Sequence, residues 1–289
     1  MVLVATESTP SRPAQGKPLL TIRPRRSWLP AHPQELWRFR ELMVRFAARD
    51  ITLRYRQAAL GVVWVVVVPL LGAGVLSFVF GGVADLPSPP GIPYFVFTLA
   101  GMVTWTAFSL VVTRSSSVLV GNSQLVGKVY FPRLLLPLST VLSTLVDVAV
   151  SLVLLAVTMV ISGVHPGLGV VTLPIWFLAV LALALGAGLF FGALEVPYRD
   201  IQYIVPVGVQ FLLFASPVAY SLASVPAHAR FWYELNPLTG LLEGMRWSMI
   251  GTSRPSWGLC AYSLACAVAA LAVGVVVFSR MERRFADVI

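Results

Sequence analysis

Charge is scarce in this sequence. Aspartate, glutamate, lysine and arginine make up 11% of its 289 residues, whereas soluble domains carry about 25%. Hydrophobic residues make up 57% of the chain, and its mean hydropathy is +0.83. This composition excludes an ordinary soluble domain and is typical of a chain that faces lipid over most of its length.

Residues that carry enzyme chemistry are scarce as well. The chain has three histidines and two cysteines, and no cluster of histidine, cysteine and carboxylate has the spacing of a metal site. The stretch from Gly121 to Lys128 resembles a phosphate-binding loop, but one residue too many separates Gly121 from Gly127, and Val129 replaces the hydroxyl residue that binds Mg²⁺. We therefore predict no catalytic residues, no metal ligands and no cofactor in this chain.

Long apolar runs, in contrast, are abundant. A helix needs about 20 residues to cross a hydrocarbon core about 30 Å thick, and six runs reach that length. The runs are continuous and do not alternate polar with apolar residues, so they favour helices over a membrane β-barrel. We predict an all-α polytopic membrane protein whose six spans cover residues 60–81, 93–113, 134–161, 170–194, 203–221 and 257–279.

Lysine and arginine are distributed unevenly between the segments that connect these runs. Of the 21, eleven precede residue 60, three lie in 114–133, one lies in 195–202 and three follow the last run. Segment 222–256 has three, and 82–92 and 163–169 have none. The positive-inside rule then places both termini and the segments 114–133 and 195–202 in the cytosol. The net charge of +9 is explained by this asymmetry, with anionic membrane lipid rather than nucleic acid as the surface partner.

Two parts precede the first span. Residues 1–33 are rich in proline and basic residues and predict a disordered cytosolic tail. Residues 34–56 combine an amphipathic helix with a basic run. The helix, over 34–51, lies in the cytosolic interface of the membrane in one interpretation and packs on a soluble partner in the other. Its apolar face is formed by Leu36, Phe39, Met43, Phe46 and Ala47.

Segment 222–256 is external by its charge, yet it is rich in aromatic residues. Pro226, Pro237 and Gly240 prevent one straight span. A pair of short re-entrant or interfacial helices over 222–250 fits this pattern, and such backbone is tolerated at membrane depth only against protein or a water-filled cavity. We interpret the segment as a candidate outer gate, and the alternative is an aromatic belt at the lipid headgroups. The gate candidates are Phe231, Trp232, Tyr233, Asn236, Glu243 and Arg246.

One acidic residue, Asp147, falls in the middle of a span. An ionisable residue at membrane depth often marks a transport pathway. A structural interpretation is equally open, because Ser143, Thr144 and Ser151 are near enough in sequence to bond its side chain. An ion-coupled transporter would need several such residues, so we expect any transport energy to come from a separate subunit.

Five motifs occur in an order that resembles a known family. They are Arg54-Tyr55-Arg56-Gln57-x-x-Leu60-Gly61-x-x-Trp64, Asn122-x-x-Leu125-x-x-Lys128-x-x-Phe131-Pro132-Arg133, Tyr198-Arg199-Asp200-Ile201, Ser216-Pro217-Val218-x-Tyr220, and Asn236-Pro237-Leu238-x-x-x-x-Glu243-x-x-Arg246. In this order and at these distances, they resemble the permease subunit of ABC-type exporters of O-antigen, teichoic acid and related polysaccharides. The resemblance covers residues 35–289.

The resemblance implies a homodimer with six spans per subunit in a bacterial plasma membrane, over residues 57–289. Two separate cytosolic ATPase subunits would hold ATP and Mg²⁺ and dock on a coupling segment at 114–133. The serines 115–117 are expected to take part in that docking. The other coupling candidates are Asn122, Leu125, Lys128, Phe131, Pro132, Arg133, Arg199 and Asp200.

The implied substrate is a polysaccharide linked to polyprenyl diphosphate. Arginine pairs well with phosphate oxygens, so Arg49, Arg54 and Arg56 are candidates for headgroup recognition, against a role in topology alone. Aromatic rings can stack on sugar faces along a route through the membrane. The candidates for channel lining are Trp64, Phe78, Asp147, Tyr203, Phe211, Phe214 and Tyr220.

Two other functions compete with polysaccharide export. An ABC exporter permease for a drug or a small lipid would share the number of spans, but we would not expect the Phe-Pro-Arg segment beside an N-terminal amphipathic helix. A polytopic glycosyltransferase or acyltransferase would show clustered acids or histidines in its loops. Segment 114–133 has no acid, and 195–202 has only Glu195 and Asp200.

Overall fold

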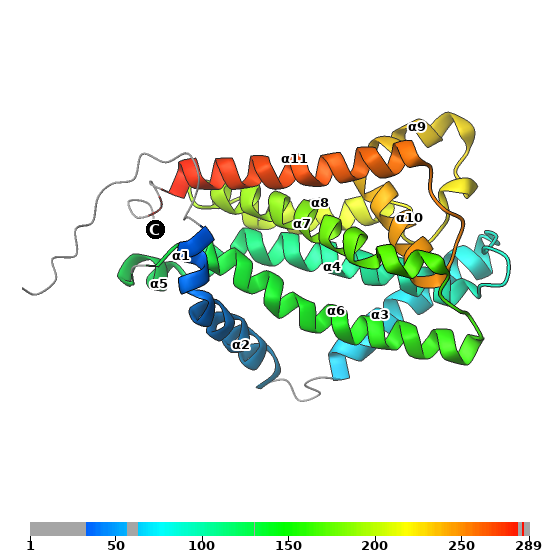
Figure 1. The fold of residues 1–289 in the computed structure, drawn as a ribbon, viewed down its shortest axis with the longest axis horizontal. Coiled ribbons are helices and arrows are strands. Elements are labelled where there is room, and N and C mark those ends of the chain that lie inside the picture. The colour runs from blue at the N-terminus through cyan, green and yellow to red at the C-terminus, as the bar shows by residue number, and fades with distance from the viewer. Residues whose placement is uncertain (1–32, 57–62, 130, 283–284, 286–289) are drawn as a thin grey trace, which may run out of the picture.

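The computed structural model describes residues 33–56, 63–129, 131–282 and 285, and every regular element within these ranges is a helix. The predicted tail lies outside the described residues apart from Pro33. The helices run roughly along one long axis (Figure 1). They are α1 (Pro33–Arg38), α2 (Arg40–Arg56), α3 (Val63–Ser77), α4 (Tyr94–Gly121), α5 (Ser123–Lys128), α6 (Leu135–Ser162), α7 (Leu173–Glu195), α8 (Ile201–Phe214), α9 (Ala227–Leu235), α10 (Pro237–Ile250) and α11 (Trp257–Glu282).

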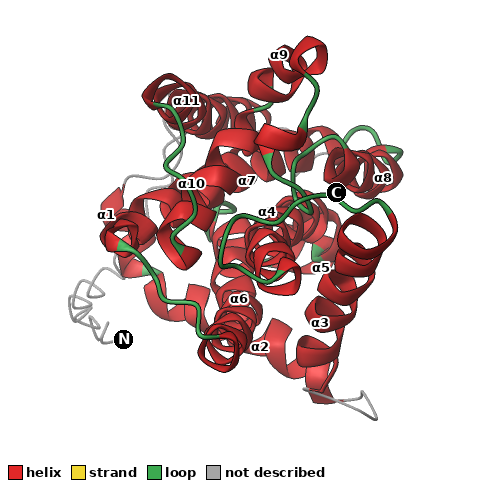
Figure 2. Ribbon diagram, turned by 90° about the vertical axis from the view of Figure 1, so that its right-hand side faces the viewer, coloured by secondary structure: helices red, strands yellow, loops and turns green. Residues whose placement is uncertain are grey.

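The two ends of the bundle differ in their elements. One end carries α1, α5 and the last turn of α11, and we call it the α5 end (Figure 1). The other carries α9 and α10, and we call it the α9 end. Helix α4 lies in the middle of the end-on view (Figure 2), and most of its side chains are buried. Helix α3 lies at the edge, and its only buried side chains are those of Pro69 and Ala73.

Five of the six predicted spans are present. The described residues contain five helical segments long and apolar enough to cross a membrane, which are Val63–Val83, Tyr94–Gly121, Leu135–Ser162, Leu168–Glu195 and Trp257–Glu282. The first includes a π-helical stretch, Phe78–Val83, and the fourth begins with a 3₁₀ turn, Leu168–Thr172. At 1.5 Å per residue, a helix of 28 residues measures about 42 Å, so it extends beyond a hydrocarbon core about 30 Å thick.

The sixth predicted span, 203–221, is shorter in the structure. Helix α8 has 14 residues and ends at Phe214. Pro217 has no backbone N–H and disfavours helical geometry at Ser216, so the chain turns there. Residues 216–219 are buried in the bundle, where a straight span would have continued along its surface. The hydropathy of the segment did not predict this turn, although Pro217 could have.

Close helix contacts in the core depend on glycine. A Cβ atom on Gly274 of α11 would overlap the backbone of Gly186 in α7, and one on Gly188 would lie 2.6 Å from Cβ of Ser115 in α4. Small residues allow helix backbones to approach closely in a membrane. These glycines let α7 pack tightly between α4 and α11.

The N-terminal amphipathic helix is two helices, α1 and α2, with a break at Phe39. Phe46 and Ala47, on its apolar face, are buried, and Phe46 packs in a cluster with Phe131 and Leu135. Other residues of the same chain cover this part of the apolar face. The two predicted arrangements had placed it against the membrane interface or against a soluble partner. Trp37 remains exposed, and Arg40 stacks on its ring at 5.2 Å.

The predicted pair of short helices in segment 222–256 is present as α9 and α10. Asn236 separates them, and its side-chain oxygen accepts a hydrogen bond from the backbone N–H of Leu238 at 3.0 Å. Pro237 occupies the first position of α10, where its missing N–H costs nothing. The depth of these helices in a membrane stays a prediction.

Candidate functional site

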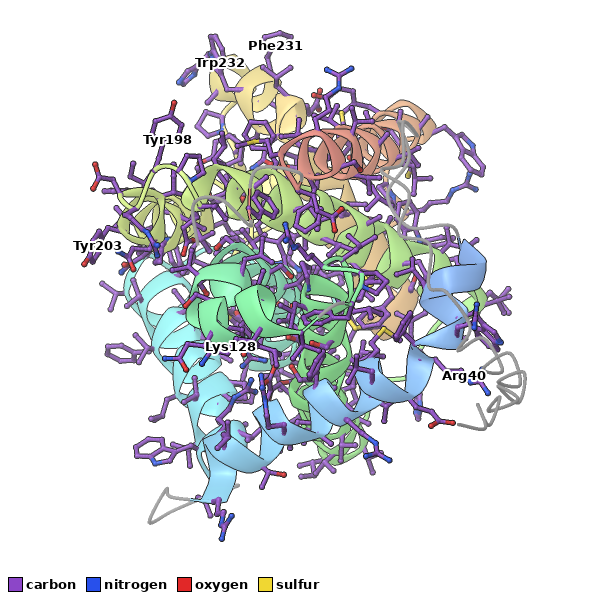
Figure 3. The ribbon with its side chains drawn as sticks, turned by 90° about the vertical axis from the view of Figure 1, so that its left-hand side faces the viewer. Arg40, Lys128, Tyr198, Tyr203, Phe231 and Trp232 are labelled. Carbon is purple, nitrogen blue, oxygen red and sulfur yellow. The ribbon has the colours of Figure 1, made fainter. Side chains whose placement is uncertain are left out.

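Helix α5 is the exposed part of the predicted coupling segment. It follows α4 after Asn122, whose side-chain oxygen accepts a hydrogen bond from Nη2 of Arg49 at 2.7 Å. The side-chain nitrogen of Asn122 donates to the carbonyl of Val118 at 2.9 Å. Leu125 is half-buried, and Lys128 is exposed near the centre of the face in Figure 3. Asn122 therefore fixes the start of α5 to α2, while Lys128 stays open to a partner.

The first part of the predicted coupling segment is not a loop. Helix α4 continues through Arg114 to Gly121, and Ser115 and Ser116 are buried inside the bundle. The Ser115 hydroxyl lies 2.8 Å from the hydroxyl of Thr140, and that of Ser116 donates to the carbonyl of Thr113. Serine can satisfy its hydroxyl on the preceding turn of its own helix. The prediction that these serines dock an ATPase is therefore wrong for Ser115 and Ser116.

The Phe-Pro-Arg motif faces inward. Phe131 is buried and meets the ring of Phe46 edge-on at 5.6 Å between centroids. Pro132 is buried beside it. The Arg133 guanidinium donates to the carbonyl of Glu282 and lies over the ring of Phe285 at 5.9 Å. These residues thus tie the predicted coupling segment to α2 and to the end of α11, whereas Lys128 and its neighbours Gly127 and Val129 are exposed.

Arg199 and Asp200 are exposed in the turn between α7 and α8. The backbone carbonyl of Asp200 accepts hydrogen bonds from the N–H groups of Tyr203 and Ile204 at the start of α8. Tyr198 and Tyr203, which flank this turn, point outward at the edge of the face that carries Lys128 (Figure 3). The two predicted coupling regions therefore lie on the same end of the bundle.

Asp147 takes part in an ion-pair cluster that the sequence did not predict. Nη1 of Arg54 and Nη1 of Arg114 lie 2.7 Å and 2.6 Å from the same oxygen, Oδ2 of Asp147. Arg114 also donates to the hydroxyl of Thr144 at 3.0 Å. Ser151 bonds the backbone carbonyl of Asp147 rather than its carboxylate. A carboxylate within a span needs a cation, and that rule is the signal that could have identified Arg114.

The three arginines proposed for headgroup recognition occupy different environments. Arg49 bonds Asn122 and pairs with Asp50 at 3.3 Å. Arg54 turns toward Asp147 in α6, and Arg56 is exposed at the end of α2. The structure therefore brings Arg54 together with Arg114 but does not gather all three.

The predicted channel aromatics lie mainly on the outer surface of the chain. Most of them project from α3, from the π-helical stretch that follows it and from α8, which a single copy leaves uncovered; these are Trp64, Phe78, Tyr203, Phe211 and Phe214. Tyr220 differs, because its hydroxyl donates to that of Tyr233 at 2.9 Å.

The predicted gate residues separate into two groups. Phe231 and Trp232 are exposed on α9 and point away from the bundle (Figure 3). Glu243 and Arg246, in contrast, are buried, and their charged atoms lie 3.6 Å apart. This pair belongs to the core rather than to an exposed gate surface.

Arg246 holds the turn after α8 in place. Its guanidinium donates to the carbonyls of Val218 and Tyr220, the latter at 3.3 Å, and lies 4.1 Å over the ring of Phe97 in α4. A Cβ on Gly101 would overlap both Val218 and Arg246. Sequence reasoning missed Phe97 and Gly101, because nothing in α4 distinguishes them from other apolar residues.

Comparison with known proteins identifies the architecture. The model of a family described as "ABC-2 type transporter" matches residues 42–250, from α2 to the end of α10. This chain belongs to the ABC-2 type transporter family. The resemblance found in the five motifs is thereby confirmed, and the chain is a multi-pass membrane permease of an ABC transporter. Members of this family are transport subunits rather than enzymes, which agrees with the lack of catalytic motifs.

Several proteins named for polysaccharide export or transport are similar to most of the chain. The "O-antigen export system permease protein RfbA" of Klebsiella pneumoniae is 26% identical over 86% of this chain and 95% of its own length. The protein of the same name from Myxococcus xanthus is 31% identical over 72% of this chain and 80% of its own. The "Polysialic acid transport protein KpsM" of Escherichia coli is 26% identical over 68% of this chain and 76% of its own.

Proposed function

We propose that this ABC-2 permease exports a polysaccharide linked to polyprenyl diphosphate from the cytosol across the bacterial plasma membrane. One observation supports this more than any other: the similarity to an O-antigen export permease spans 86% of this chain and 95% of that relative. Similarity to a polysialic acid transport protein supports the same substrate class, since both names concern polysaccharide.

Both termini and α5 face the cytosol in this proposal. The end of α11, α1 and α5 lie at one end of the bundle (Figure 1). Eighteen of the 21 lysines and arginines lie in the segments assigned to the cytosol by their charge. A surplus of basic residues on one side favours a cytosolic position.

ATP hydrolysis by two separate subunits, which hold ATP and Mg²⁺, drives transport. Their contact is α5 together with the turn that carries Arg199 and Asp200. A coupling element must be exposed on one face and firmly attached on the other. Lys128 meets the first condition, and the contacts of Asn122, Phe131 and Arg133 with α2 and α11 meet the second.

Two copies of the chain form the transport route. The aromatic side chains on α3, on the π-helical stretch after it and on α8 are uncovered in one copy. A second copy would bring two such sets together around the polysaccharide. The headgroup enters at the basic side, where Arg49, Arg54 and Arg56 line α2. Helices α9 and α10 form the outer gate, with Phe231 and Trp232 as its exposed side chains.

Depletion of this permease in its host tests the proposal. Mass spectrometry of the polyprenyl-linked glycans should show accumulation of a long polymer on its lipid carrier, and the composition of that polymer names the substrate. An unchanged glycan pool with an intact envelope polysaccharide would contradict the proposal and favour export of a drug or small lipid. Loss of a single glycosyl or acyl modification would instead favour the transferase.

A further inference from the structure

Two guanidinium groups converge on one carboxylate oxygen where α2, α4 and α6 meet. Arg54 comes from α2, Arg114 from α4 and Asp147 from α6, and both arginines reach Oδ2 of Asp147 within 2.7 Å. The proposed function gives Arg114 no role. An arrangement of this kind is costly at membrane depth, so it calls for a functional explanation.

The cluster is basic, and its two arginines are partly exposed. Two guanidinium groups and one carboxylate leave these three side chains with a formal net charge of +1. The side chains of Arg54 and Arg114 are 31% and 22% exposed, whereas that of Asp147 is 9% exposed. The carboxylate thus lies beneath, and the guanidinium groups form the accessible rim. A planar guanidinium with five N–H donors matches the oxygens of phosphate as well as those of carboxylate.

We propose that Arg54 and Arg114 bind the phosphate groups of a lipid diphosphate and that Asp147 is an internal counter-ion, which the phosphate displaces. The inference rests on the proposed function and adds Arg114 and Asp147 to its headgroup site. A diphosphate diester carries two negative charges against one on Asp147, so it competes for both guanidinium groups. When the headgroup leaves, Asp147 pairs with both arginines again, and the three side chains return to a formal net charge of +1.

Both arginines are connected to the coupling segment. In α2, Arg49 precedes Arg54 by five residues, and its Nη2 donates to the side-chain oxygen of Asn122 at 2.7 Å. Helix α4 carries Arg114 and ends at Gly121, directly before Asn122. Asp147 lies on α6 instead. A displacement of α5 therefore acts on the two arginines through α2 and α4, and it changes their position relative to the carboxylate. This connection lets the motor subunits control the exchange between Asp147 and phosphate.

The test measures binding of inorganic pyrophosphate to the purified full-length permease by titration calorimetry at constant ionic strength. Asp147→Asn removes the competing charge, so pyrophosphate no longer has to displace a carboxylate from the two guanidinium groups. We therefore expect this variant to bind pyrophosphate about tenfold tighter than the unmodified chain, which corresponds to about 1.4 kcal/mol. Arg114→Lys keeps the charge but loses the planar fork, and we expect about tenfold weaker binding.

Matched variants separate this effect from a change in overall charge. Asp85→Asn makes the same chemical change at an exposed residue of the loop before α4, and Arg45→Gln removes an exposed cation from α2. Neither should change pyrophosphate binding. If Asp147→Asn does not fold, the Arg114→Lys variant, whose charge balance is intact, decides the test. Equal binding by the unmodified chain, Asp147→Asn and Arg114→Lys would overturn the inference, and the cluster would be a lock between helices.

A second arm identifies the source of the phosphate. Phosphatidylcholine nanodiscs that contain the Asp147→Asn permease are titrated with a polyprenyl diphosphate or with phosphatidylglycerol at equal added charge. Preference for the diphosphate supports the inference, and equal binding of both lipids overturns the assignment to a substrate headgroup. If the variants bind pyrophosphate equally while polysaccharide export is intact, this inference alone is overturned. Glycan pools that do not respond to depletion would overturn the proposed function instead.

Discussion

Two arginine sites, one toward each end of the bundle, accommodate a buried charge in different ways. Arg246, at the α9 end, is fully buried and bonds backbone carbonyls of the turn after α8. Arg54 and Arg114 are partly exposed and share a side-chain carboxylate. A backbone carbonyl cannot leave without moving its whole segment, whereas a carboxylate can rotate away. The same residue type therefore provides a fixed contact in one region and an exchangeable one in the other.

The largest expected effect concerns the fixed contact. Arg246→Met leaves the buried Glu243 without its cation and two carbonyls without a donor, and breaking a buried ion pair costs about 3–5 kcal/mol. We expect the variant to unfold at a much lower temperature in detergent, if it folds at all. Thermal unfolding followed by circular dichroism measures this. Arg254→Met, which alters an exposed arginine at the same end, is the control, and an equal loss in both would contradict the role of Arg246.

A smaller effect is expected where α2 meets the coupling segment. Asn122→Ala removes the acceptor of Arg49 and the hydrogen bond to Val118. The site is half-exposed, so we expect a loss of about 1–2 kcal/mol in the free energy of unfolding. Gln124→Ala, at an exposed position of α5, should change it by less than about 0.5 kcal/mol. Stability curves in detergent would detect the difference, and two superimposable curves would show that Arg49 does not anchor α5.

The smallest effect on stability, and a large one on transport, is expected at the exposed part of α5. Lys128→Ala should change the free energy of unfolding by less than about 0.5 kcal/mol, because its side chain is exposed. In the complex with the ATPase subunits, the same change should lower ATP-dependent polysaccharide export in proteoliposomes. Arg38→Ala removes an exposed cation from α1 and should leave export intact. Full export by Lys128→Ala would rule out Lys128 as a coupling residue.

The sequence was sufficient to predict the membrane helices where hydrophobicity alone decides the structure. Five predicted spans correspond to helices, since a continuous apolar run in lipid must form one. It was insufficient where one residue overrides the average of many, as Pro217 does after α8. It also misplaced the start of the coupling segment, because Arg114 and the three serines that follow have the composition of a loop.

The contacts of the candidate site could be predicted only in part. Lys128 was expected to be exposed and is, since a basic residue after a span remains in water. The pairing of Arg54 and Arg114 with Asp147 joins residues 93 and 33 positions apart, and no local pattern contains that information. The contact of Arg246 with Val218 and Phe97 likewise depends on how three segments pack.

Helix α4 has a mechanical consequence. It runs without a break from Tyr94 to Gly121 and contains no proline, the residue that most often produces a hinge in a helix. Phe97, near its first turn, lies under Arg246, and Asn122 follows its last. A small displacement of α5 is therefore transmitted along α4 as a rigid-body movement. The distance from Gly121 to Phe97 is roughly 36 Å, given 1.5 Å per residue. Motion at the α5 end and motion beneath α9 and α10 are then coupled directly through one helix, without intervening loops.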